Sequence, residues 1–396
     1  MPNSVANTTN TKGNVMEYPF AINTKGRKVV LGGERNKIQA GLTLEGLRDK
    51  VRSWSRAQDR VDHSFPLNMF HFGFDEGTAT LSLKKASGGL EAPMYFTRHG
   101  FGQVARELMP NRGGLHMEET VRKFEKVGQK MASLYMNLWA SGSEKPRMLR
   151  TMRTKMPNGD VVRVARSLHS TSYAVYDNAQ FIDDLLSSDL GNAHVLSFSM
   201  ADNGMRLRFA TQQLNEITRN KPIPMYEAWN GETGLCKTHL KAGVYKEICT
   251  NGLKAFVSNK AWNWRHYGDP TRIQQGVSDA LHTLRLEADG LLRQYNRSLE
   301  TTIDDAYGWM EAELARHKDI SSGFVDRVTM AMKDPTSSER GTLANVIDGV
   351  TLAAQHILED KSTSDLLEQD FFERIAGDLM QRGLKAANGG KILVTV

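Results

Sequence analysis

Residues 147–178 read RMLRTMRTKMPNGDVVRVARSLHSTSYAVYDN, and this stretch decides the fold of the chain. Apolar and basic residues alternate on both sides of the Pro-Asn-Gly sequence at 157–159, and a period of two is typical of β-strands. The turn residues at its centre predict that the two strands form a hairpin. Between Lys145 and Arg166, seven basic residues accompany one acidic residue, Asp160, a net +6 that equals the formal charge of the whole protein.

A second hairpin is predicted downstream. HVLSFSM at 194–200 and MRLRFA at 205–210 flank an Asp-Asn-Gly turn, and Asn-Gly is the strongest short-range hairpin signal. The second arm alternates Arg206 and Arg208 with apolar residues. Two hairpins that each carry arginines on one strand face predict one antiparallel sheet with a basic surface.

Helical periodicity precedes and follows the hairpins. Apolar residues recur at helical spacing near 43–62, 97–108 and 117–140, and the same period continues from residue 271 to about residue 385. Residues 1–16 have little to bury and are predicted to be disordered. We therefore predict an α+β fold, with an antiparallel sheet built from hairpins and packed helices in a basic core domain at 17–268. A mostly helical C-terminal domain is predicted at 269–396.

Composition restricts the class of protein. The 396 residues are 40% apolar, which is ample for a hydrophobic core. No window approaches 18 uninterrupted apolar residues, and the polar N-terminal residues lack the apolar segment of a secretory signal. Two cysteines without a C-x-x-C pair fit a reducing compartment. We expect a soluble cytoplasmic protein without a membrane partner.

The charge is distributed unevenly along the chain. Residues 301–396 contain ten Lys/Arg and sixteen Asp/Glu, a net −6, which leaves +12 for residues 1–300. A basic body favours a polyanionic partner, and an acidic tail suits assembly or competition with that partner. Two solvated faces of opposite sign are the alternative explanation.

Nucleic-acid binding requires a basic surface that neutralises phosphates and aromatic side chains that stack on bases. The sequence lacks zinc-finger, helix-turn-helix and RNP signatures, so we expect binding directed to the backbone rather than to particular bases. The candidate contacts come from both hairpins and the neighbouring turns: Arg147, Arg150, Arg153, Lys155, Arg163, Arg166, Tyr173, Tyr176, Arg206, Arg208 and Arg265. Trp262 and Trp264, beside Arg265, are the alternative source of stacking side chains.

A metal-dependent enzyme that processes nucleic acid is the alternative. Such an enzyme needs carboxylates that converge on Mg²⁺ to activate water, and the candidates are Asp177, Glu232 and His266. No nuclease signature groups them, and Asp177 also suits a helix cap, so enzymatic activity is the less favoured reading. Mg²⁺ is expected as a cofactor only if the protein is such an enzyme, and no other metal or cofactor is expected. Ser167 near His169 lacks the context that exposes a nucleophile.

Three segments, taken in order, resemble a phage/plasmid-like protein family that carries a domain of unknown function. They are FTRHGFGQVARELMP at 96–110, the basic hairpin continued into SYAVYDNAQFIDDLL at 172–186, and GETGLCKTHLKAGVYKEICTNGLK at 231–254 with WRHYG at 264–268. The resemblance covers residues 90–268 and implies a phage or mobile-element origin without an established activity. Position by position it marks His99, Phe101, Gln103, Arg163, Tyr173, Asp177, Asn178, Glu232, Gly234, Cys249, Asn251, Gly252, Arg265 and His266.

By analogy, basic phage proteins of this kind are similar to single-strand annealing proteins, whose rings hold DNA in a basic groove. The leading hypothesis is a phage-encoded protein that binds nucleic acid, with single-stranded DNA expected, in replication or recombination within an infected bacterial host. The C-terminal helices are expected to mediate homo-oligomerisation. A third hypothesis is an assembly or host-interaction protein that uses its acidic helical tail.

Overall fold

The computed structural model describes residues 17–19, 28–30, 34–36, 42–75, 78–108, 113–155, 159–201, 204–211, 221–247, 254–257, 261–334, 337–356 and 364–394. Its helices are α1 (Leu44–Ala57), α2 (Arg98–Leu108), α3 (Gly113–Ser141), α4 (Asn178–Leu186), α5 (Pro270–Glu300), α6 (Ala306–Leu314), α7 (Ser322–Met332), α8 (Leu343–His356) and α9 (Ser364–Ala386), with a 3-10 turn at Leu67–Met69. Of the predicted hairpin turns at 157–159 and 202–204, only Gly159 and Gly204 are among the described residues, and Cys249, Asn251 and Gly252 also lie outside them.

The predicted basic hairpin is confirmed as β8 (Pro146–Lys155) and β9 (Val161–Ser170), which pair antiparallel with a bulge after Arg150. It forms the middle of a sheet whose order is β4-β8-β9-β7-β6-β5, and only β7 and β9 run parallel among these strands. The remaining strands are β4 (Val61–Pro66), β5 (Phe70–Asp75), β6 (Thr78–Leu83) and β7 (Met94–Phe96). Helices α2 and α3 pack on this sheet over a separate hydrophobic cluster that includes Phe72, Phe96 and Leu149.

The second predicted hairpin is confirmed as β10 (His194–Ala201) and β11 (Gly204–Ala210), but it belongs to a different sheet. That sheet has the order β14-β13-β12-β11-β10-β3, with β15 also paired to β13. Its other strands are β3 (Glu34–Asn36), β12 (Ile223–Asn230), β13 (Thr238–Glu247), β14 (Lys254–Val257) and β15 (Ala261–Trp264). The prediction of one shared sheet is therefore wrong, because the turns around α4 carry the chain from the first sheet to the second.

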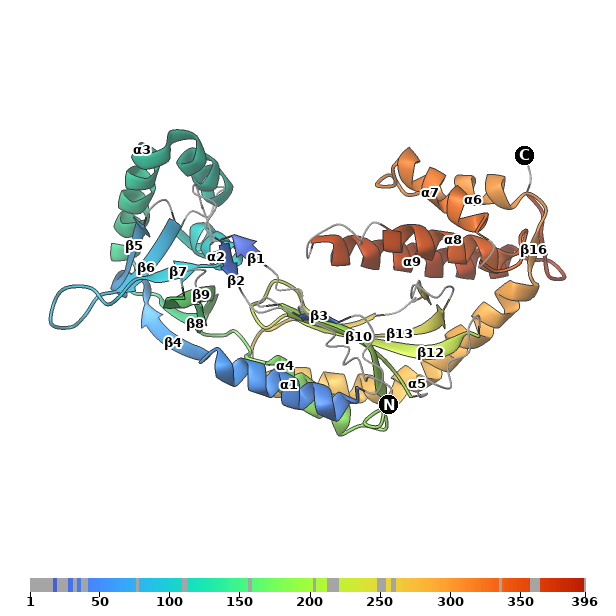
Figure 1. Ribbon diagram of the computed structural model, residues 1–396, viewed down its shortest axis with the longest axis horizontal. Helices are drawn as coiled ribbons and strands as arrows, with labels where there is room; N and C mark the ends of the chain where they lie inside the picture. Colours follow the sequence, from blue (N-terminus) through green and yellow to red (C-terminus); the bar gives the residue numbers. More distant parts are fainter. Residues whose placement is uncertain are drawn as a thin grey trace, which may run out of the picture.

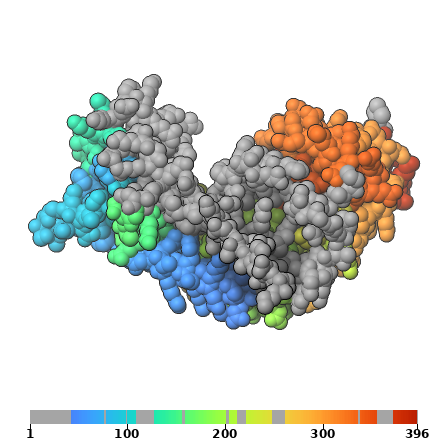
Figure 2. Space-filling view, viewed as in Figure 1, coloured from blue at the N-terminus to red at the C-terminus, as the bar shows by residue number. Residues whose placement is uncertain are grey.

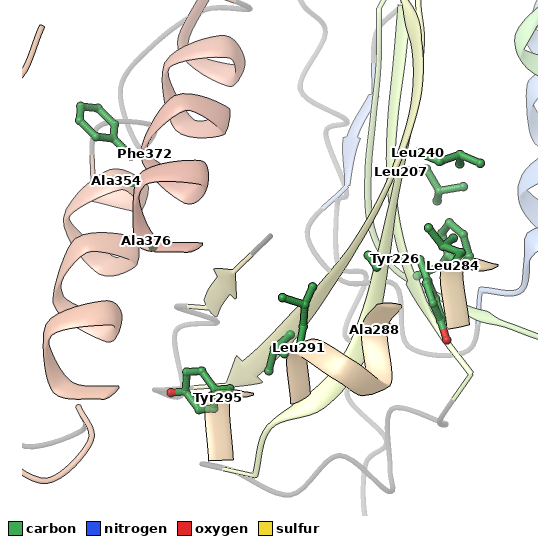
Figure 3. Close-up of a cluster of buried hydrophobic side chains, with 14 of the residues drawn as sticks. Leu207, Tyr226, Leu240, Leu284, Ala288, Leu291, Tyr295, Ala354, Phe372 and Ala376 are labelled. Carbon is green, nitrogen blue, oxygen red and sulfur yellow. The ribbon is translucent and has the colours of Figure 1, made fainter. Parts of the chain in front are cut away.

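Helix α5 covers the apolar face of the second sheet. It begins where the sequence predicts, since Pro270 is its first residue and the Asp269 side chain accepts the backbone N–H of Thr271 at 2.9 Å. Figure 3 shows Leu207 and Leu240 on the side of the sheet that faces Leu284 of α5, with α9 on the opposite side. One hydrophobic cluster joins these residues to α8 and α9, so it extends across the predicted domain boundary at residue 269.

In Figure 1 the first sheet lies at the left, the second sheet in the centre and helices α6–α9 at the right, while α1 and α4 lie side by side below the second sheet and pack in its hydrophobic cluster. In the space-filling view, the first sheet and the α6–α7 region form the two ends of the coloured surface (Figure 2). Two short pairings complete the described strands: β1 (Glu17–Pro19) with β2 (Lys28–Val30), and β16 (Thr302–Ile303) with β17 (Lys391–Ile392). The architecture is α+β with antiparallel sheets and a helical C-terminal region, as predicted. Among the described helices, none has the length and apolar character needed to cross a bilayer.

Candidate functional site at the junction of the two sheets

Glu232 lies in the turn after β12 and is fully buried where the two sheets meet. Its Oε2 accepts a hydrogen bond from Arg166 of β9 at 2.9 Å and also pairs with Arg60, while its Oε1 accepts the backbone N–H of Asn178 at 2.9 Å. Burial raises the pKa of this carboxyl, but the attraction of Arg60, Arg166 and Arg150 outweighs burial and lowers the pKa to about 2. Glu232 is therefore an ionised carboxylate whose two oxygens are both engaged.

Arg150 connects this centre to the surface. Its buried guanidinium donates from Nε to Asp62 at 2.9 Å, from Nη2 to Asp177 at 2.7 Å, and from Nη1 to the backbone oxygen of Glu232. Asp62 and Asp177 are both partly exposed, at 32% and 46% of the side chain. The buried Arg150 guanidinium therefore pairs with two carboxylates, Asp62 on β4 and Asp177 at the start of α4.

Three rings stack beside Glu232. Tyr173 lies between His169, at 3.7 Å between ring centroids, and His266, at 5.3 Å, and its hydroxyl donates to the backbone oxygen of Glu232 at 2.9 Å. Burial, followed by the positive charge of Arg150, lowers the pKa of His169 to about 3, and burial also lowers the pKa of His266. Both imidazoles are neutral at physiological pH, and Tyr173 has a ring on each of its faces.

The turn at 231–234 collects several of the residues that the family resemblance marks. His99 and Gln103 of α2 both donate to the backbone oxygen of Thr233, at 2.9 and 3.3 Å. Gly234 has φ +72°, and a Cβ there would lie 2.9 Å from the His169 ring, so only glycine fits. Segments that are far apart in the sequence therefore meet at one turn. The family resemblance gives only the order of these segments along the chain and does not predict that they meet.

Five arginines predicted to contact phosphate are buried instead, so the prediction that they lie on an exposed surface is wrong. Each has a carboxylate partner, because a guanidinium is buried only when its charge is paired. They are Arg147 with Glu107, Arg150 with Asp62 and Asp177, Arg166 with Glu232, and Arg206 and Arg208 with Glu227 and Glu373.

The arginines of the second hairpin lie under α9. Glu227 Oε2 accepts from Nε of both Arg206 and Arg208 at 2.8 Å, and Glu373 of α9 accepts from Arg208 at 2.5 and 2.6 Å. All four side chains are buried. Burial raises the pKa of Glu227, but the two arginines overcome that effect and hold it well below the usual range.

Neither predicted stacking tyrosine offers a free ring. Tyr176 is fully buried, and its hydroxyl donates to Asp184 Oδ2 at 2.6 Å. Tyr173 is enclosed by the two imidazoles described above. The two tyrosines thus hold the turn before α4 against the second sheet rather than presenting a surface to bases.

The remaining predicted basic contacts are accessible. Arg153, Lys155 and Arg163 lie on one face at the outer end of the hairpin, where Arg153 and Arg163 are directly opposed across the two strands. We call these three residues the outer basic cluster. Asp59 forms an ion pair with Arg153 Nε at 3.1 Å and accepts a hydrogen bond from Arg163 Nη2 at 2.7 Å. Arg265, in the turn before α5, is also exposed.

The alternative catalytic set converges but does not form a metal-ligand group. Asp177, Glu232 and His266 surround the same centre, yet Asp177 pairs with Arg150, and both His266 nitrogens are engaged by Thr238 and the backbone oxygen of Ala174. Within the ranges that the structure describes, no three His, Cys, Asp or Glu side chains are arranged to hold a metal ion. Asp177 stands at the N-cap position of α4 without a side-chain capping hydrogen bond, which corrects the predicted capping role.

Sequence reasoning missed Arg60. The periodicity places it on the solvated face of a helix at 43–62, but α1 ends at Ala57 and Asp59 adopts φ +43°, which turns the chain into β4. Arg60 then lies over the Trp54 ring at 4.3 Å and reaches Glu232. No periodic signal in the sequence marks this reversal.

No protein-family model, no curated protein and no solved structure matches this chain. The resemblance to the phage/plasmid-like family therefore stays a prediction.

Proposed function

We propose that this chain binds nucleic acid, with single-stranded DNA as the expected form, as a phage-encoded factor in replication or recombination. The outer basic cluster, rather than the buried arginines, is the phosphate-contacting element of this proposal. Arg265 is a second accessible contact. Binding would be directed to the backbone, because Tyr176 is buried and Tyr173 stacks on two imidazoles, so neither is available to a base.

The proposal rests on the net charge of residues 1–300 that remains after the buried charged side chains are subtracted. In the described part of residues 1–300, seven Lys or Arg and two Glu side chains are buried, a net +5. Setting this against the +12 of that segment leaves +7 for its other residues. A surplus of this size favours a polyanion through release of its counterions.

The geometry of the outer basic cluster suits a phosphate. Its side chains project from one strand face, and 57% of the Arg153 side chain is exposed. Arg153 and Arg163 share the single carboxylate of Asp59, so their two charges are only half neutralised. An exposed ion pair of this kind contributes little to stability, and a phosphate can replace the carboxylate at small cost.

The test measures binding of a labelled single-stranded oligonucleotide between 50 and 200 mM salt by fluorescence anisotropy. The variant Arg153→Ala/Lys155→Ala/Arg163→Ala is expected to lose on the order of tenfold in affinity and to lower the salt slope by about two to three. The matched control Arg316→Ala/Lys318→Ala/Arg327→Ala removes three charges from exposed positions in the acidic C-terminal region. It is expected to retain the affinity of the parent protein.

Two results would overturn the proposal. Absence of binding at 50 mM salt would remove nucleic acid as the partner. Equal losses in both triple variants would show that net charge alone, and not the outer basic cluster, determines binding.

A further inference from the structure

Helix α3 exposes a continuous apolar face. Six large apolar side chains between residues 127 and 139 are each 42–73% exposed: Val127, Met131, Leu134, Tyr135, Leu138 and Trp139. The largest contiguous apolar patch on a soluble monomer measures about 300–600 Å² and often serves a function. A face of this composition is therefore typical of a surface that is covered in the functional state.

The orientation of α3 is determined by its other side. Ala132, Met136 and Ala140 are buried in the hydrophobic cluster of the first sheet. Ser133 donates to the Phe72 backbone oxygen at 2.6 Å, and Asn137 both donates to that oxygen and accepts the Phe72 N–H, each at 2.8 Å. The helix cannot rotate its exposed face inward without losing these contacts, so among the described residues this face stays exposed.

The spacing of the exposed residues suits packing against a second helix. Residues 127, 131, 134 and 138 follow intervals of four, three and four, which is the pattern of the apolar seam in a coiled coil. Tyr135 and Trp139 widen one side of the seam. The positions on this arc between 127 and 139 carry no charged residue, whereas Lys130 stands at its border. These intervals place the four side chains on one face of α3, as a helix-to-helix seam requires.

The area is sufficient for a second copy. With roughly 150–250 Å² for each large side chain, the exposed fractions leave on the order of 600 Å² of apolar surface on this face. A standard interface buries about 800 Å² on each partner, and a rim of polar contacts supplies the remainder. The helix lies at the outer end of the molecule in Figure 1, where a second copy has access.

We propose that the exposed face of α3 pairs with the same face of a second copy of this chain across a twofold axis. The same patch then serves both subunits, as an isologous interface requires. This relocates the self-association predicted for the C-terminal helices. The apolar side chains described in α8 and α9 belong instead to the core of their own subunit.

The test measures the mass of the full chain by light scattering after size-exclusion chromatography, with nuclease-treated protein at about 1–100 µM and high salt. The parent protein is expected to show twice the 44.3 kDa mass of one chain. The variant Leu134→Glu/Leu138→Glu is expected to lose the dimer and run as one chain. The matched control Leu286→Glu/Met330→Glu changes side chains that are 71% and 72% exposed on α5 and α7, and is expected to remain dimeric.

A second variant controls for the possibility that the glutamate substitutions unfold α3. Leu134→Ala/Leu138→Ala retains helix propensity and is expected to weaken dimerisation at least tenfold, with an unchanged circular-dichroism spectrum. A parent protein that stays at 44.3 kDa throughout the concentration range, or a dimer that persists in both α3 variants, would overturn the proposal. Monomeric parent protein that binds phosphatidylglycerol vesicles through α3 would also overturn it and assign the face to lipid.

Discussion

The inner and outer ends of the β8–β9 hairpin have the same sequence pattern and different environments. At the inner end, Arg147, Arg150 and Arg166 are buried and paired with carboxylates. At the outer end, Arg153, Lys155 and Arg163 remain partly or fully exposed. What differs is the presence of carboxylates from remote elements, such as Glu107 of α2 and Glu232 after β12. At the outer end Asp59 supplies one carboxylate to two arginines, so a basic stretch in a sequence becomes a basic surface where the rest of the fold supplies fewer acids than the stretch has cations.

The largest expected effect comes from breaking the inner end. Glu232→Gln leaves Arg60 and Arg166 as buried charges that lack their carboxylate, and we expect the free energy of unfolding to fall by about 3–5 kcal/mol. Urea denaturation monitored by circular dichroism measures the change. At the outer end, Asp59→Asn removes a half-exposed carboxylate and is expected to change stability by less than about 1 kcal/mol. Equal losses of stability in the two variants would contradict the difference between the inner and outer ends of the hairpin.

The second hairpin extends the comparison to arginines that are buried by a different element. Glu373→Gln removes the α9 carboxylate that both Arg206 and Arg208 approach, while Glu227 stays in place. We expect a loss of about 3 kcal/mol by the same measurement, at the lower end of the range for a broken buried pair because one carboxylate remains. A variant as stable as the parent protein would mean that Glu227 alone compensates both arginines.

The lowered pKa of His169, at the inner end of the hairpin, predicts that the stability of the protein depends on pH. In the unfolded chain His169 binds a proton below about pH 6.5, whereas its pKa in the folded protein is about 3. Because the unfolded state binds more protons between these values, stability falls as pH falls through this window, by about 2 kcal/mol from pH 7 to pH 5 for this residue. Urea titrations at pH 7, 6 and 5 measure the slope, and His169→Phe is expected to flatten it. Parallel curves for the two proteins would assign the slope to other groups.

The smallest effect on stability is expected at the outer basic cluster. Arg153→Ala/Lys155→Ala/Arg163→Ala removes partly exposed side chains, so its free energy of unfolding should stay within about 1 kcal/mol of the parent value. Thermal unfolding measures this difference alongside the oligonucleotide assay. Strong destabilisation would show that the outer end also stabilises the fold. A loss of oligonucleotide binding by this variant would then be explained by unfolding.

Local patterns predict the elements of this fold well. The alternation of apolar and basic residues predicts both hairpins, and the Asp-Pro sequence before the long periodic segment predicts where α5 begins. The packing of these elements depends on contacts that no local pattern contains. Alternation shows which strand face Arg206 and Arg208 share, but the helix that covers this face begins more than 150 residues later. The same reason separates the two hairpins into two sheets and brings Arg60 to Glu232.

The pairing of Glu373 with Arg206 and Arg208 has a consequence for the order of synthesis. The ribosome delivers β11 and β12 long before α9, so the nascent sheet presents two arginines to a single glutamate until residue 373 emerges. During that interval the two arginines share the single carboxylate of Glu227. Arrival of α9 then supplies the second carboxylate and closes the core over this face of the sheet, so this part of the fold is completed only after residue 373 has emerged.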